Sequence, residues 1–422
     1  MKNFADSYIK RNNLLPKISE SPNKDLNIIV VIPCINEPLL EKTLLSLKNC
    51  QKPKSAVELI VVINSAENSS NLIKAQNRKT LVETEKWIKN NSSDQLKYRI
   101  IFVENIPKKI AGAGYARKIG MDEAILRFSE LENENGIIAS FDADSTCQEN
   151  YFVEIEKIHE NEKTNVCTIF FEHDIEGEDF PQDVYDAIIE YELYLRYYKN
   201  ALNYINFPYS FQTVGSSFTV RAWVYTKQGG MNRRQAGEDF YFLHKVFPLG
   251  NVQELNTTTV FPSPRPSDRV PFGTGKAVQK YLEAEKKELL TYNFNAFIHL
   301  KSFFDRINKL YKIDLNTYNL LLKNLPKPVS NFLQSIDFFL NLKEINDNSS
   351  SLKSFKKRFF NTFNAFMILK YLNFVHENFF DKIPINSATK HLLSELKQKQ
   401  FDNFSNKQFL QFFRKFDRRV SN

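Results

Sequence analysis

The first half of the chain alternates apolar runs with segments of helical pattern. Residues 27–32 and 57–63 are nearly continuous runs rich in Ile and Val, and residues 98–103 and 136–141 are two further apolar runs. Strands that are apolar on both faces are typical of parallel sheets covered by helices. Between the first two runs, residues 37–48 carry leucines at roughly helical spacing. The alternation predicts an α/β fold with a doubly wound sheet, which binds ligands at the carboxyl ends of its strands.

Polar side chains follow three of these predicted strands. Glu37 comes shortly after the first, Asn64 and Ser65 follow the second, and Asp142 and Asp144 follow the fourth. Residues two apart on an extended strand point to the same side, so both aspartates can meet one ligand. Mg²⁺ and Mn²⁺ are often held by one or two carboxylates together with a substrate diphosphate. An acidic turn after a buried strand is common, and it is the convergence on one sheet edge that favours a metal site.

The composition changes sharply at Gly275. All 12 glycines lie at or before this residue, whereas 21 of the 37 phenylalanines follow it. Residues 276–422 carry 25 Lys and Arg against 13 Asp and Glu, a net charge of +12, which leaves −4 for residues 1–275. A glycine-free, Phe-rich, basic segment is expected to be helical. We therefore expect a polar lead-in over residues 1–26, an α/β domain over 27–275 and an all-helical domain over 276–422.

The bulk properties narrow the class of protein. With 422 residues, 42% of them hydrophobic, the chain can bury a large core. We find no apolar stretch that would form a membrane-spanning helix, and the N-terminal 25 residues lack the apolar core of a signal peptide. The four cysteines show no CxxC spacing, which favours free thiols in a reducing compartment. These features lead us to expect a globular protein in the cytoplasm. The net charge is positive but no base-reading motif is present, so we expect no binding to nucleic acid.

Seven short segments follow one another along residues 27–275: residues 31–37, 61–65, 111–120, 141–145, 214–221, 229–231 and 237–239. In this order they resemble the first two strands and turns, the glycine-led helix with an Ala-Arg pair, the metal motif, the acceptor-side strand, the double glycine and the base motif of the family 2 glycosyltransferases, which have the GT-A fold. The resemblance implies a hexosyltransferase that moves a sugar from a nucleotide diphosphate sugar to an acceptor hydroxyl. It also implies inversion at the anomeric carbon and a divalent cation, Mn²⁺ or Mg²⁺, as cofactor.

The resemblance assigns roles to individual residues. The donor nucleotide would be bound by Glu37, Asn64, Ser65, Arg117 and Asp142. The metal would be held by Asp144 with Asp142, and the acceptor would be contacted by Glu238 and Ser216. The base that removes the proton of the acceptor hydroxyl would be Asp239. The family usually has an acidic residue reading uracil where this chain has Asn64 and Ser65, so the base of the donor stays open. Simpler roles exist as well. Asn64 and Ser65 can cap a turn, and acidic residues at 238–239 can complement a helix dipole.

A proline-rich loop over residues 261–276 is a second concentration of charged and polar side chains. Arg265, Arg269 and Lys276 lie in or at the end of this loop, beside Gly273 and Gly275. A loop of this composition can form a lid whose cations stabilise a leaving diphosphate. A linker between two domains is the alternative that its position allows.

The basic second part allows two interpretations. Residues 355–374 place six apolar residues near one helical stripe, which predicts a helical core built from Phe side chains. Lys353, Lys356, Lys357 and Arg358 can form a solvated face, or they can contact anionic lipid at the inner face of the membrane. The helices are expected to pack on the α/β domain or on a second subunit, as in a homodimer.

Two alternatives to the inverting enzyme stay open. A retaining GT-A transferase of the mannosylglycerate-synthase kind shares the DxD motif but needs no base at Asp239. A catalytically idle binding or scaffold protein would keep only the fold, and the presence of Asp142, Asp144 and Asp239 argues against it.

Overall fold

Two compact units make up the computed structural model, which describes residues 3–233, 237–267, 273–398, 401 and 403–419. The first unit contains residues 1–188, 213–283 and 414–422, and the second contains residues 189–212 and 284–413. Gly275, where the composition changes, lies in helix α9 (Thr274–Glu283), which belongs to the first unit. Each unit is therefore assembled from separate stretches of the sequence.

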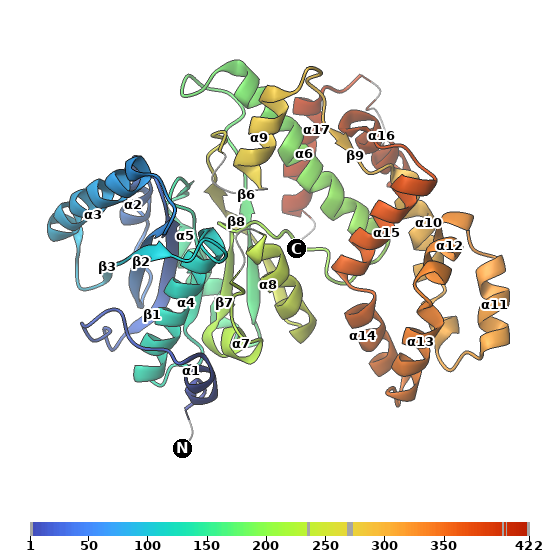
Figure 1. Ribbon diagram of the computed structural model, residues 1–422, viewed down its shortest axis with the longest axis horizontal. Coiled ribbons are helices and arrows are strands. Elements are labelled where there is room, and N and C mark those ends of the chain that lie inside the picture. The colour runs from blue at the N-terminus through green and yellow to red at the C-terminus, as the bar shows by residue number, and fades with distance from the viewer. Residues whose placement is uncertain (1–2, 234–236, 268–272, 399–400, 402, 420–422) are drawn as a thin grey trace. The chain divides into compact units, whose positions relative to one another are not determined.

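A mixed sheet forms the centre of the first unit (Figure 1). In the described part of the chain it has eight strands, in the order β3-β2-β1-β4-β7-β6-β8-β5. Their bounds are β1 (Leu26–Cys34), β2 (Ala56–Ala66), β3 (Leu96–Ile106), β4 (Ile137–Ser140), β5 (Thr146–Cys147), β6 (Val166–Phe171), β7 (Phe218–Arg221) and β8 (Val252–Phe261). The first four strands pair in parallel, whereas β7 runs antiparallel to both β4 and β6. The predicted α/β class is confirmed, with the difference that β7 makes part of the sheet antiparallel.

Helices cover both faces of this sheet. Helices α2 (Leu40–Lys48), α3 (Asn71–Asn91) and α5 (Tyr151–Glu160) bury their apolar side chains on the face that carries Val30. Neighbouring residues of a strand point to opposite faces, so Val31 faces the other side. There α4 (Ala113–Glu130) approaches closely, and a Cβ added at its Gly120 would lie 2.4 Å from a methyl carbon of Val31. The absence of a side chain at Gly120 therefore allows the helix to lie on the sheet.

The remaining elements of the first unit are α1 (Asp6–Asn12), the start of α6 (Gln182–Tyr204), α7 (Ala222–Lys227), α8 (Glu238–Val246), a 3-10 helix (Phe247–Leu249) and α9. The last residues of the chain also belong here. Arg418, in α17 (Asn406–Arg419), donates to Oγ1 of Thr259 at 2.9 Å, and its guanidinium lies 4.0 Å from the ring centroid of Phe170. The basic C-terminus is thus part of the packing of the α/β unit.

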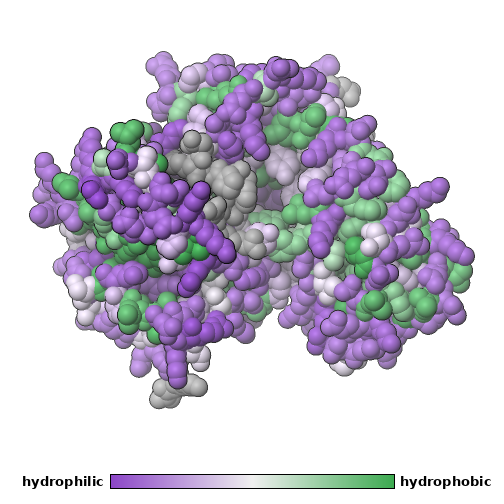
Figure 2. All heavy atoms as spheres, viewed as in Figure 1, coloured by the Kyte–Doolittle hydropathy of each residue, from purple (hydrophilic) through white to green (hydrophobic). Residues whose placement is uncertain are grey.

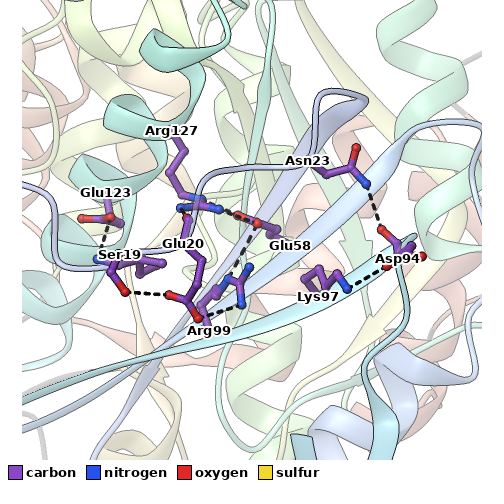
Figure 3. Close-up of polar contacts among 10 residues, drawn as sticks. Ser19, Glu20, Asn23, Glu58, Asp94, Lys97, Arg99, Glu123 and Arg127 are labelled. Atoms are coloured by element: carbon purple, nitrogen blue, oxygen red, sulfur yellow. Dashed lines mark hydrogen bonds and ion pairs between the residues drawn. The ribbon is translucent and has the colours of Figure 1, made fainter. Parts of the chain in front are cut away.

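A buried ion-pair network joins β2, β3 and α4 (Figure 3). Glu58 lies on β2 with its side chain 1% exposed, and Arg127 of α4 donates to both of its carboxylate oxygens, at 2.6 Å for Nη2. Arg99 of β3 lies 3.8 Å from the same carboxylate and also pairs with Glu20 at 3.3 Å. Arg127 further donates to the carbonyl of Glu20 at 2.9 Å. The network ties the N-terminal segment to the sheet and to α4.

We expect Arg127→Ala to lower the free energy of unfolding by about 3–5 kcal/mol, because the change leaves a buried carboxylate without its main partner. Urea unfolding followed by circular dichroism measures the effect. Lys97→Ala is the control, since Lys97 pairs with the fully exposed Asp94, and we expect it to change stability by less than about 1 kcal/mol. Equal losses in the two variants would contradict the importance of the buried pair.

The second unit is mostly helical. Its elements are the C-terminal part of α6 (Gln182–Tyr204), the short strands β9 (Leu290–Thr291) and β10 (Ile383–Pro384), and the helices α10 (Phe294–Phe304), a 3-10 helix (Ile307–Leu310), α11 (Leu315–Lys323), α12 (Lys327–Ser335), α13 (Phe338–Asp347), α14 (Leu352–Thr362), α15 (Ala365–Asn378), α16 (Ile385–Glu395) and most of α17. Phe303, Phe338, Phe359 and Phe363 are buried and touch one another, with Phe359 and Phe363 stacked at 5.9 Å. The prediction of a helical region with a core of Phe side chains is confirmed.

The stripe predicted over residues 355–374 is divided between two helices. Asn364 ends the continuity, because its side chain caps α15 by accepting from the backbone N–H groups of Phe366 and Met367. The four basic residues of the expected surface are exposed on α14, namely Lys353, Lys356, Lys357 and Arg358. They are therefore available to solvent or to a partner, and the expected lipid contact stays a prediction.

The accessible surface is largely hydrophilic on the face shown in Figure 2, with apolar residues in scattered patches. Among the described residues, no helix is both long and apolar enough to cross a membrane.

Candidate functional site

The first unit brings five carboxylates and two arginines into one region, from strand ends, helices and a loop. Glu37 follows β1, Asp142 and Asp144 follow β4, and Glu238 and Asp239 open α8. The sheet order places β4 between β1 and β7, which explains why residues remote in sequence meet there. The prediction that the polar residues after β1 and β4 converge is confirmed, because one arginine contacts Glu37 and Asp144 together.

That arginine is Arg265, from the loop after β8. Its Nη2 pairs with Oε2 of Glu37, its Nη1 donates to Oε1 of the same residue at 3.3 Å, and Nη2 also reaches Oδ2 of Asp144 at 3.2 Å. Glu37 is fully buried, whereas Arg265 and Asp144 keep about a quarter of their side-chain surface exposed. Burial alone would lower the pKa of Arg265, but the two carboxylates raise it above its usual value. Arg265 is therefore a fixed positive charge at the open side of the site.

A second arginine, Arg117 of α4, lies deeper. One Nη atom donates to Asp142 and the other to Glu238, and the side chains of Arg117 and Glu238 are 6% and 2% exposed. Burial would lower the pKa of this guanidinium, yet the carboxylates of Asp142, Glu238 and Asp239 raise it well above the usual value. Arg117 was expected to face the nucleotide, and in the structure it lies between two acidic segments.

Asp239 is a buried carboxylate whose acidity is strongly altered. Gly237 precedes α8 with a φ of 69°, and Oδ1 of Asp239 accepts from the backbone N–H of Phe240 at 2.7 Å. Burial, and next the charge of Glu238, raise the pKa of Asp239 from 3.8 to about 7, against the opposing effect of Arg117. A carboxylate with a pKa near neutrality is well suited to accept a proton in catalysis.

The expected nucleoside residues after β2 are buried and retain bonding capacity. Asn64 donates to the carbonyl of Gly112 at 3.5 Å, and its own carbonyl accepts from Asn77 at 2.8 Å. Within the described part of the chain, Oδ1 of Asn64 and Oγ of Ser65 are buried without a hydrogen-bond partner. Unpaired buried oxygens are costly unless a ligand or water satisfies them. These two atoms therefore suit a hydrogen-bonding ligand such as a nucleobase.

The other predicted site residues differ in placement. Ser216 is fully buried after Gly215, with its Oγ 3.3 Å from that of Ser217. Lys276 lies in the first turn of α9 and donates to Oε1 of Gln279 at 3.1 Å. Arg269 lies outside the described residues. The expected lid is therefore represented in the site by Arg265.

The carboxylates at the end of β4 are suitable ligands for a divalent cation that also binds a diphosphate. Asp142 and Asp144 supply two carboxylates from one strand end, and such pairs complete their coordination with substrate phosphates and water. Among the residues that the structure describes, no group of three or more His, Cys, Asp and Glu side chains is arranged to hold a metal ion. The arginine contacts of both aspartates mean that a cation would compete with a guanidinium for each carboxylate.

Sequence reasoning missed two functional features. The first is the bridging position of Arg117, which depends on contacts 25 and 121 residues away. The second is Gly215, where an added Cβ would lie 2.7 Å from Nη2 of Arg117 and 3.0 Å from Oδ2 of Asp239. A small residue before Ser216 was visible in the sequence, but nothing there identified the side chains that need the space.

Comparison with solved structures found similar chains. Residues 1–349 of S. aureus TarS in complex with UDP-GlcNAc are 14% identical over 71% of this chain and 79% of that chain, with a TM-score of 0.41. GalNAc-T7 with UDP, GalNAc and Mn²⁺ is 15% identical over 61% of this chain and 48% of that chain, with a TM-score of 0.36. These neighbours are glycosyltransferases with GT-A-like folds. A scan of protein-family models and a search of curated proteins found no match.

Proposed function

We propose that the protein is an inverting glycosyltransferase that transfers a sugar from a nucleotide diphosphate sugar to an acceptor hydroxyl. One observation carries the proposal. In the first unit, the Asp142–Asp144 pair at the end of a strand lies beside the partly exposed Arg265, and Asp239 has a near-neutral pKa. The aspartate pair with Arg265 suits a diphosphate, and Asp239 suits the removal of a proton from a hydroxyl.

In this mechanism Asp239 accepts the proton of the acceptor hydroxyl while the oxygen of that hydroxyl attacks the anomeric carbon. The bond from that carbon to the diphosphate oxygen breaks, and the released diphosphate carries the electron pair. Arg265, held by Glu37, stabilises the leaving group. Arg269 and Lys276, from the same proline-rich stretch of the sequence, are proposed for the same role. A divalent cation bound at Asp144 and Asp142 would neutralise diphosphate charge. Asn64 and Ser65 would bind the nucleoside, and Glu238 and Ser216 would line the acceptor side.

The test is a binding screen of UDP-, GDP- and dTDP-sugars by calorimetry, with and without Mn²⁺, followed by an assay for the released nucleoside diphosphate. We expect one nucleotide to bind more tightly with Mn²⁺ and its sugar to be hydrolysed slowly when no acceptor is present. Binding without any hydrolysis or transfer would favour the idle scaffold protein. Absence of binding to every nucleotide sugar would refute the proposal.

We further propose that the enzyme works in the cytoplasm, where its basic α14 surface contacts anionic lipid at the inner face of the membrane. The proposal is supported by four basic residues that are exposed on this helix, Lys353, Lys356, Lys357 and Arg358. Sedimentation with vesicles containing phosphatidylglycerol, against vesicles of phosphatidylcholine alone, tests the contact. The homodimer stays a prediction that light scattering can check.

A further inference from the structure

Arg117 is buried between two carboxylates, which is not the placement expected of a residue that binds phosphate. Both of its terminal nitrogens are engaged, one with Asp142 and the other with Glu238, and its side chain is only 6% exposed. A diphosphate that reached this guanidinium would have to share its N–H groups with these two carboxylates. The guanidinium instead joins the end of β4, which carries the DxD motif, to the start of α8, which carries Asp239.

The surroundings of Arg117 are built to hold it there. A Cβ at Gly215 would lie 2.7 Å from Nη2 of Arg117 and 3.0 Å from Oδ2 of Asp239, closer than side-chain carbons normally approach. Gly215 is itself fixed, because its carbonyl accepts from Oγ of Ser140 at 2.6 Å. Glycine is needed at this position because any side chain would occupy space beside the guanidinium.

Charge balance points the same way. The described groups whose charges act on Asp239 are Glu238 from its own helix, Arg117 from α4 and Asp142 from the end of β4. Arg117 is the cation among them and offsets the two neighbouring carboxylates. Without it, three acidic side chains would face one another in a largely buried space, and such an arrangement favours protonation.

We propose that Arg117 is a positioning residue that holds the base Asp239 and the DxD strand end in register, with Gly215 providing its space. The inference rests on the proposed function, because it assumes that Asp239 acts as a base. It assigns Arg117 to catalytic geometry and not to donor affinity. Since an error of about 1 Å in a reacting group can cost about 10²-fold in rate, the effect is expected in kcat.

The experiment compares Arg117→Lys and Arg117→Gln with wild type, using the donor identified by the nucleotide-sugar screen. We expect Arg117→Lys to lower kcat by about 10²-fold while the Kd for the nucleoside diphosphate changes by less than about threefold. Arg117→Gln removes the charge as well, so the acidic limb of its kcat profile should move to higher pH by about one to three units. Arg127→Lys is the matched control, a buried arginine on the same helix that is paired with Glu58. It should keep the wild-type pH profile.

Gly215→Ala is the second variant, for use if Arg117→Gln does not fold. Its methyl group would displace the guanidinium, and we expect the same loss of kcat with an intact Arg117 side chain. A rise in the nucleoside diphosphate Kd of more than about tenfold in Arg117→Lys, with an unshifted pH profile in Arg117→Gln, would make Arg117 a phosphate ligand and overturn the inference. Unchanged kinetics in the Arg117 variants would overturn it too. An inactive wild-type protein would instead remove the proposed function.

Discussion

Replacing Asp239 with Asn is expected to reduce transfer to the acceptor by about 10²- to 10⁴-fold. Asn keeps the size of the side chain but cannot accept the proton of the hydroxyl. Donor binding should stay within about threefold of wild type, because Arg265 and the Asp142–Asp144 strand end are untouched. Initial rates with saturating donor measure the loss, and calorimetry measures donor affinity.

The wild-type rate should rise with pH as Asp239 loses its proton, with a midpoint near its pKa of about 7. The rise should be absent from the residual activity of Asp239→Asn. NMR of the product decides the stereochemistry. Inversion together with the rate loss supports Asp239 as the base, whereas retained configuration or a wild-type rate in the variant would favour the retaining alternative.

The same substitution should affect stability with a defined sign. The pKa of Asp239 is raised in the folded state from 3.8 to about 7, so the folded protein binds this proton more tightly than the unfolded chain. Its contribution to the free energy of unfolding therefore falls as pH rises from about 4 to about 7. We expect the Tm of Asp239→Asn, relative to wild type, to increase across this window and to level off above it. Thermal unfolding at pH 5 and pH 8 gives the comparison.

Asp144→Asn is expected to abolish most of the enhancement that Mn²⁺ gives to nucleoside diphosphate binding. The substitution removes a charged ligand from the strand end that would share the cation with the diphosphate. A loss of about 1.5–3 kcal/mol, the usual value for a hydrogen bond to a charged group, corresponds to about 10- to 100-fold in Kd. Calorimetric titrations with and without Mn²⁺ measure the effect.

Asp94→Asn is the control for this variant, because Asp94 is a fully exposed carboxylate paired with Lys97. It should bind nucleoside diphosphate as wild type does. Circular dichroism should show that both variants are folded. If Asp144→Asn kept the full Mn²⁺-dependent affinity, the assignment of Asp144 as a metal ligand would be wrong.

The elements around the candidate site could be predicted where local sequence dominates. Runs that are apolar on both faces gave β1 and β2 at nearly the expected residues, and the acidic pair after residue 141 lies at the end of β4 as its spacing indicated. The helical pattern of residues 37–48 became α2. These features follow from side-chain periodicity and strand propensity, which are properties of short segments.

Longer-range features were not available to such reasoning. The antiparallel strand β7 enters the sheet between β4 and β6, although its sequence follows that of β6, and no local pattern specifies that order. The helical stripe of residues 355–374 is broken because Asn364 caps a new helix. Hydrophobic periodicity describes one segment at a time, so it does not indicate which segments become neighbours in the fold.

The sequence by itself determined the fold class, the helical second part and the residue types at the strand ends. Only the tertiary structure decided that Arg265 joins Glu37 to Asp144 and that Arg117 joins Asp142 to Glu238. It also decided that Gly215 leaves room for Arg117 and Asp239. The near-neutral pKa of Asp239 likewise arises from burial and from neighbouring charges. Burial and proximity between distant segments arise only when the chain has folded, and they determine which acidic residues are paired and which one can accept a proton.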